Sequence, residues 1–107
     1  MSSYLESEDS TDDSVDYEKS ISEEELANIK EECLQLKAAG NELFSQSFYP
    51  EAIVKYSEAV KILKNARLPK DSIILLNRCA AYLAINKYVP ALNDANQGEE
   101  YFLLIIT

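Results

Sequence analysis

The chain has 107 residues, two cysteines, no histidine and a formal net charge of −9. This length allows one small domain and disfavours a multi-step active site, and the residues needed for a structural zinc site or a Cys-His nucleophile are missing. Residues 1–32 carry twelve acidic and two basic side chains, whereas residues 33–107 carry seven and eight. Because nucleic-acid binding needs a basic stripe, we expect no nucleic-acid partner. The missing ligand residues lead us to expect no metal, and no cofactor is predicted either.

Residues 1–21 are rich in serine, aspartate and glutamate and have no helical or strand period. Such a segment buries too little apolar surface to offset the entropy lost on ordering, so it is predicted to be a disordered acidic arm. It lacks the apolar core of a signal peptide, which favours a reducing setting, cytoplasmic by default or nuclear, with both cysteines as packing residues. The arm could compete weakly for an acid-binding groove; the simpler interpretation is a solubilising tail.

The first predicted helix begins at Ser22, because Ser22 and Glu25 have the spacing of a capping box. Glutamates at 23–25 also complement the positive end of the helix dipole. Apolar or small residues then recur at spacings of three and four, which predicts one buried face of a helix that extends to about Gln46. They are Leu26, Ile29, Cys33, Leu36, Gly40 and Leu43.

Three further helices are predicted after this one. The second covers 50–65, since Pro50 suits the first turn of a helix, and the third begins near Asp71 as its cap. The fourth begins near Val89 and Pro90 and is expected to stop where Gly98 interrupts it. Residues assigned to the inward face of the second helix are Ala52, Ile53, Tyr56, Ala59, Val60 and Leu63. The third helix carries Ile74, Leu75, Cys79, Tyr82 and Leu83, and the fourth runs through Ala91, Leu92 and Ala95.

The second and fourth predicted helices open with related sequences, which indicates an internal repeat. Residues 48–53 (FYPEAI) match residues 87–92 (KYVPAL), so Ala52 and Ala91 lie 39 positions apart. A period of about 34 residues plus a five-residue insertion at 67–71 accounts for this spacing. Small residues recur where helices would cross, which lets their axes approach closely. The predicted helix-packing residues are Ala39, Gly40, Ala52, Tyr56 and Ala59 in the first copy and Cys79, Tyr82, Ala91 and Ala95 in the second.

The segments LKAAGNELF, FYPEAIVKYSEAV, LLNRCAAYL and KYVPALNDA closely resemble the tetratricopeptide repeat. More narrowly, they resemble repeats of co-chaperones that bind the acidic C-termini of heat-shock proteins 70 and 90, and the acidic arm is similar to that of the tetratricopeptide repeat protein 1 group. The resemblance covers about residues 33–97 and implies an all-α fold of antiparallel helix-turn-helix units. It predicts a domain at 22–97, with one repeat at 33–66, the insertion at 67–71 and a second, incomplete repeat at 72–97.

In that co-chaperone family, a lysine and two asparagines contribute to a carboxylate clamp for a Glu-Glu-Val-Asp tail. The resemblance places these roles on Lys37, Asn41 and Asn77. Lys37 and Asn41 are four residues apart and share one helix face, and an ammonium and two carboxamides can bind a terminal carboxylate. The alternatives are ordinary solvated side chains, or a helix start at Asn77 and Arg78. Lys55 and Arg78 are not included in the predicted site.

The chain departs from the family pattern after residue 97. A third repeat, its basic residues and a closing helix are missing, and residues 98–107 match no repeat position, so a truncated isoform is one interpretation. An open repeat stack predicts marginal stability and self-association through the exposed apolar end. The apolar run at 101–106 is far too short to span a membrane. The leading prediction is a non-enzymatic, co-chaperone-like adaptor for a heat-shock chaperone tail; the alternatives are a scaffold without a clamp and a non-functional isoform.

Overall fold

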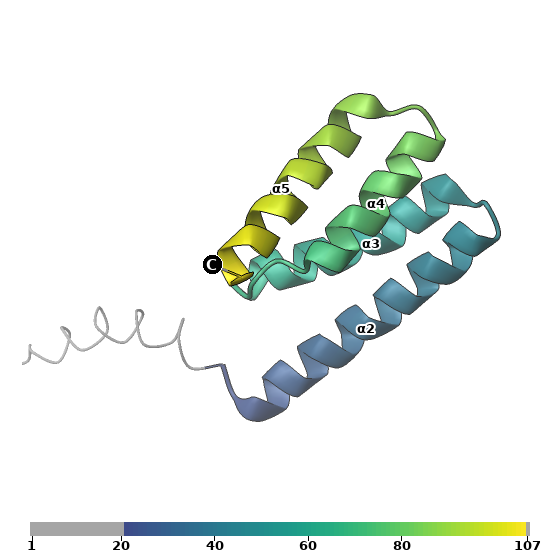
Figure 1. The fold of residues 1–107 in the computed structure, drawn as a ribbon. Coiled ribbons are helices and arrows are strands. Elements are labelled where there is room, and N and C mark those ends of the chain that lie inside the picture. The colour runs from purple at the N-terminus through teal and green to yellow at the C-terminus, as the bar shows by residue number, and fades with distance from the viewer. Residues whose placement is uncertain (1–20, 107) are drawn as a thin grey trace, which may run out of the picture.

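The computed structural model describes the backbone of residues 21–106 and the side chains of residues 21–99, and this part of the chain forms four α-helices (Figure 1). Helix α2 spans Glu23–Ser45, α3 spans Tyr49–Asn65, α4 spans Ser72–Ala84 and α5 spans Tyr88–Ile106. The described residues include no strand, and the predicted all-α fold of helical hairpins is confirmed. The disorder predicted for the acidic arm concerns residues 1–20, which lie outside the described residues.

The helix starts follow the local signals in the sequence. At the start of α2, the backbone N–H of Glu25 donates to Ser22 Oγ at 3.0 Å, and the backbone N–H of Ser22 donates to Glu25 Oε1 at 3.3 Å, which completes the capping box. At α4, Asp71 Oδ1 accepts from the backbone N–H groups of Ile73 and Ile74 at 2.9 and 3.2 Å. Helix α3 carries Pro50 in its first turn, where a missing N–H removes no intrahelical bond.

The ends of α2, α3 and α4 share one geometry. Ser47, Arg67 and Asn86 have φ values of 67°, 59° and 62°. The next residue's N–H reaches back five positions in each case, from Phe48 to Leu43, from Leu68 to Leu63 and from Lys87 to Tyr82, all at 2.9 Å. With the accompanying shorter bonds from residues 47, 67 and 86, these are Schellman motifs made without glycine. These bonds occupy carbonyl groups at the C-terminal end of each helix before the loop begins.

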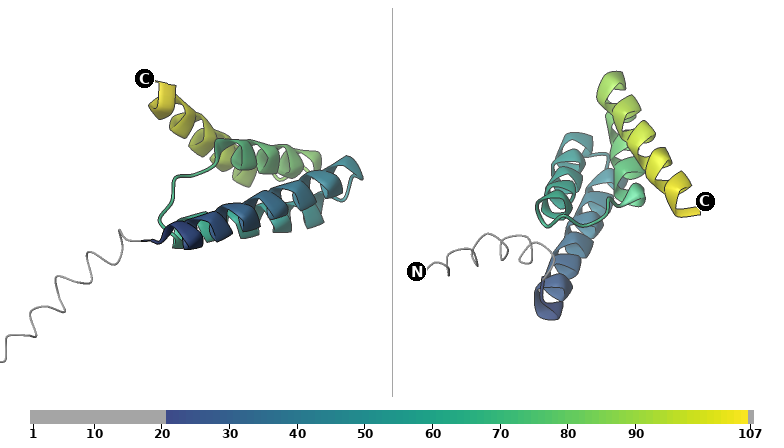
Figure 2. Two further views of the ribbon diagram at one scale, coloured as in Figure 1. Left: turned by 90° about the horizontal axis from the view of Figure 1, so that it is seen from below. Right: turned by 90° about the vertical axis from the view of Figure 1, so that its left-hand side faces the viewer.

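The four helices form two antiparallel hairpins, α2–α3 and α4–α5, that stack through α3 and α4 (Figures 1 and 2). The buried core cluster lies at that junction and comprises Ala52, Tyr56 and Ala59 of α3 together with Ile74 of α4. Partly buried apolar side chains surround it, namely Leu36, Leu43, Phe44 and Val60. Three of the four cluster residues come from α3, which packs against both α2 and α4 and so links the two hairpins.

Both glycines of the chain lie inside helices, at points where another helix packs closely. Gly40 of α2 is buried against the ring of Tyr56, and a Cβ at this position would stand 2.6 Å from Tyr56 Cε1. Gly98 is also buried, and a Cβ there would meet Leu76 Cδ2 at 3.2 Å. The predicted interruption at Gly98 is wrong, because α5 continues through it to Ile106. The glycine sets a close approach to α4, and the hydrogen bonds of a helix tolerate it at a cost of about 1 kcal/mol.

Of the predicted helix-packing residues, Gly40, Ala52, Tyr56, Ala59 and Ala91 are buried, while Ala39, Cys79, Tyr82 and Ala95 are half-buried. Two apolar residues of the predicted helices, Leu83 and Leu92, have exposed side chains, at 49% and 62%. Leu83 belongs to the last turn of α4, and Leu92 directly follows the buried Ala91 on α5. A three-four period identifies a face, but it does not show how far the neighbouring helix extends along that face.

Candidate functional site

The three residues predicted to bind a carboxylate come from two helices. Lys37 and Asn41 lie one turn apart on α2, and Asn77 lies on α4. Although Asn41 and Asn77 are 36 positions apart, Asn77 Nδ2 donates to Asn41 Oδ1 at 3.1 Å. Lys37 and Asn77 are half-buried and Asn41 is exposed. The stacking of the two hairpins therefore brings the two carboxamides together on an accessible surface.

Tyr56 orients the amide of Asn41. Its hydroxyl donates to Asn41 Oδ1 at 2.5 Å, while its ring is buried in the core at 1% exposure. Burial raises the pKa of the Tyr56 hydroxyl, which keeps it in the protonated, donating form. Since Oδ1 of Asn41 accepts from both Tyr56 and Asn77, its Nδ2 group is left to donate elsewhere. The remaining donors at the site are amide N–H groups and the Lys37 ammonium, which suit a carboxylate.

Asp71 is a residue of this site that the sequence reasoning assigned only a capping role. Its Oδ2 lies 3.8 Å from Lys37 Nζ, and the two side chains are 34% and 27% exposed. Its other oxygen caps α4. A partly exposed ion pair of this length contributes no more than about 1 kcal/mol, so it holds Lys37 in place without preventing an exchange of partner.

Arg78 is engaged in a separate, largely buried cluster between α3, α4 and α5. Its Nε and Nη2 donate to the two carboxylate oxygens of Asp94 at 2.7 Å each, and its Nη1 donates to Ser57 Oγ at 3.0 Å. The guanidinium also lies 5.9 Å from the ring centroid of Tyr82. The hydrogen bonds to Asp94 raise the pKa of Arg78 further above its usual value. The cluster joins the two hairpins.

These contacts decide one open alternative and show what the sequence reasoning missed. Asn77 and Arg78 do not start a helix, because α4 begins at Ser72 with Asp71 as its cap. Asp94, which is 1% exposed, was not identified. The signal was available: Asp94 follows the inward Ala91 by three positions, so it shares that face and needs a buried cationic partner. Tyr56 likewise needed a partner for its hydroxyl once it was assigned to the core.

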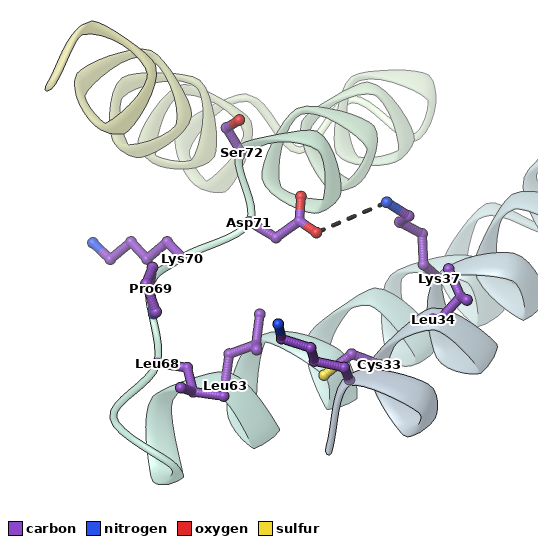
Figure 3. Close-up of a pocket in the computed structure, with 10 residues that line it drawn as sticks. Cys33, Leu34, Lys37, Leu63, Leu68, Pro69, Lys70, Asp71 and Ser72 are labelled. Atoms are coloured by element: carbon purple, nitrogen blue, oxygen red, sulfur yellow. Dashed lines mark ion pairs between the residues drawn. The ribbon is translucent and has the colours of Figure 1, made fainter. Parts of the chain in front are cut away.

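The longer connection between α3 and α4 is flanked by two pockets. The first, which we call the α2–loop pocket, has a volume of about 410 Å³. Figure 3 shows Lys37 and Leu34 on the α2 side of this pocket and Pro69 and Lys70 on the loop side. The second, the α3–α4 pocket, has a volume of about 550 Å³. The two pockets share Leu63, Leu68, Lys70 and Asp71 as lining residues.

The described residues show no arrangement suited to metal binding, and their cysteines are not activated. No group of three or more potential metal ligands was found among these residues. Cys33 and Cys79 are free thiols, and burial is the main cause that raises the pKa of each. A raised pKa lowers the thiolate fraction and hence the reactivity of the sulfur. In the part of the chain that the structure describes, no helix has the length and apolar character needed to cross a membrane.

Comparison with known proteins gives several relatives. The chain is 34% identical over 92 residues to RNA polymerase II-associated protein 3 of Rattus norvegicus, which covers 86% of this chain and 13% of the relative. It is 34% identical over 87 residues to small glutamine-rich tetratricopeptide repeat-containing protein 2 of Saccharomyces cerevisiae, which covers 81% of this chain and 23% of that relative. It is 41% identical over 58 residues to the Hsp70-Hsp90 organizing protein of Triticum aestivum, which covers 54% of this chain and 9% of that relative. The chain thus spans less than a quarter of the length of each of these relatives. No family model matches it, and no solved structure matches it.

Proposed function

Because the chain belongs to the tetratricopeptide repeat family, we propose that it is a non-enzymatic adaptor that binds the acidic C-terminal peptide of a heat-shock chaperone. We assign α2–α3 to one repeat and α4–α5 to the second. The wheat relative is named for organising Hsp70 and Hsp90, which supports a chaperone as the partner. The peptide would lie against α2 and α4, with its carboxylates on Lys37, Asn41 and Asn77.

The observation that carries this proposal is the convergence of donors from two helices. Asn41 and Asn77 are hydrogen-bonded to each other at 3.1 Å, and Tyr56 fixes the amide of Asn41 from the core. A pair of amides held in this way loses little conformational entropy when a ligand arrives, which favours binding. Lys37 stands one turn away on α2 and supplies the positive charge.

The first test measures the affinity of a Glu-Glu-Val-Asp peptide for the full chain and for Lys37→Ala by isothermal titration calorimetry. Hydrogen bonds to charged groups contribute about 1.5–3 kcal/mol each, so we expect Lys37→Ala to weaken binding by about tenfold or more. Lys55→Ala is the matched control, because Lys55 is a half-buried lysine of α3 whose ion-pair partner is Glu58. Equal affinity of Lys37→Ala and the unaltered chain would remove the clamp and favour the scaffold alternative, which predicts indifference to peptide carboxylates.

Asp71 gives a second prediction with the opposite sign. An incoming carboxylate must replace Asp71 as the partner of Lys37, so Asp71→Asn is expected to raise peptide affinity by about two- to fivefold, the equivalent of an exposed ion pair. Asparagine caps helices as well as aspartate does, and thermal unfolding of this variant should therefore be nearly unchanged. Affinity that falls or stays constant in Asp71→Asn would mean that Asp71 does not compete with the ligand.

A further inference from the structure

The basic side chains of this acidic protein gather around the α3–α4 connection. The chain has ten lysines and arginines, and six of them line the α2–loop pocket or the α3–α4 pocket, whereas Asp71 is the one acidic residue in either lining. The six are Lys30, Lys37, Lys64, Arg67, Lys70 and Arg78; of these, Arg78 is already neutralised by Asp94, and Lys37 is paired with Asp71. A surface with this balance attracts an acidic segment.

The α2–loop pocket combines these charges with an apolar floor. Leu34, which is 58% exposed, lines it together with Cys33, Leu63, Leu68 and Pro69. Lys30 and Lys70 are exposed at its edge and make no ion pair with any described residue. The chemistry that fits is therefore a run of carboxylates that includes an apolar side chain.

A segment of this composition is attached to the same helix. Residues 1–20 carry seven acidic side chains and one basic one, and the stretch 12–18, DDSVDYE, places Val15 and Tyr17 among four carboxylates. We propose that residues 12–18 dock on the α2–loop pocket, with their carboxylates on Lys30, Lys37 and Lys70 and an apolar side chain against Leu34. This contact is distinct from the proposed peptide site except for Lys37, and it does not depend on that function.

The length of the chain permits this contact. Lys30 lies nine residues after Ile21, or about 13 Å along α2, and Lys37 lies about 24 Å along it. An extended chain spans about 3.3 Å per residue, so about four residues bridge the first distance and about seven the second. Asp16 can therefore reach Lys30, and Asp12 and Asp13 can reach Lys37.

Covalent attachment makes weak contacts sufficient. Each exposed ion pair contributes about 0.2–1 kcal/mol, which would be negligible for a separate peptide. A short tether gives the segment an effective concentration in the millimolar range, so two or three such pairs together with one apolar contact can keep the pocket occupied. Salt should release the segment, because pairs of this kind are screened.

The test is zero-length carbodiimide cross-linking of the intact chain, followed by peptide mass spectrometry. We expect links from Asp12, Asp13 or Asp16 to Lys30 and Lys70 to exceed those to Lys61 and Lys87 several-fold, and to fall sharply in 0.5 M salt. Lys61 and Lys87 are the matched controls: both are exposed and line neither pocket, and Lys61 lies near the C-terminal end of α3, so it tests for mere proximity.

A second measurement does not rely on lysine chemistry. Replacing Asp12, Asp13 and Asp16 by asparagine in the intact chain should shift the amide resonances of Leu34 and Lys70 and leave that of Lys87 unchanged. Equal cross-linking at all four lysines would overturn the proposal. So would links found between isotopically light and heavy copies of the chain, which would assign the contact to a second copy.

Discussion

Replacing Arg78 by methionine is expected to lower the free energy of unfolding by about 3–5 kcal/mol, which is the usual cost of removing one partner of a buried ion pair. The substitution leaves the carboxylate of Asp94 at 1% exposure without its two 2.7 Å hydrogen bonds, and it also removes the bond to Ser57. Because the three residues come from α3, α4 and α5, both hairpins are weakened at once. Urea unfolding followed by circular dichroism at 222 nm measures the effect.

Two controls separate burial from charge. Lys55→Met removes a partly exposed pair with Glu58 and should change stability by no more than about 0.5 kcal/mol. Combining Arg78→Met with Asp94→Leu should recover much of the loss, since the damage comes from an unpaired buried carboxylate more than from the absence of the pair. A loss in Arg78→Met as small as that in Lys55→Met would contradict a structural role for the cluster.

Gly40→Ala and Gly98→Ala are expected to change stability in opposite directions. At Gly40 the added methyl would stand 2.6 Å from Cε1 of Tyr56, whose ring is fully buried and whose hydroxyl is bonded to Asn41, so the ring cannot move aside without loss. Overpacking of this kind costs about 1–3 kcal/mol, more than the roughly 1 kcal/mol that alanine gains over glycine in a helix. The Gly40→Ala chain should therefore unfold at lower urea and bind an acidic peptide less tightly.

At Gly98 the neighbour can yield. The closest atom to an added Cβ is Leu76 Cδ2 at 3.2 Å, and Leu76 is 44% exposed, so it can change rotamer toward solvent. The helix-forming advantage of alanine should then prevail, and Gly98→Ala should stabilise the chain by up to about 1 kcal/mol. The two variants measured together by urea unfolding test the model of close packing, because loss of stability in both, or gain in both, would be inconsistent with it.

The features that the sequence predicts well are those set by neighbours along the chain. The start of α2 at Ser22 and the start of α4 after Asp71 depend on side chains within three residues of the cap, and both are found. The outcome at Gly98 differs from the prediction because it depends on where another helix passes. A glycine in isolation indicates a break until the crossing point of the partner helix is known.

The candidate site shows the same division. The i, i+4 relation of Lys37 and Asn41 is local and was available from spacing alone. The contact between Asn41 and Asn77, and the positioning of Asn41 by Tyr56, follow from the stacking of hairpins that are distant in sequence. Asp71 was correctly assigned as a cap, but its second oxygen faces Lys37 because the α3–α4 connection returns beside α2. Pairings of this kind depend on tertiary geometry, which no period in the sequence encodes.

The hydrogen-bonded C-terminal end of α3 affects how this protein can change during evolution. Since the Schellman motif ends with the bond from Leu68 to Leu63, and Asp71 independently begins α4, only Pro69 and Lys70 lie between the two caps, and neither caps a helix. Lengthening a loop costs only about 0.6 kcal/mol for each doubling. Mutations and insertions at this connection can therefore alter the two pockets beside it while the hairpins keep their arrangement, so that surface specificity can diverge without a corresponding loss of foldability.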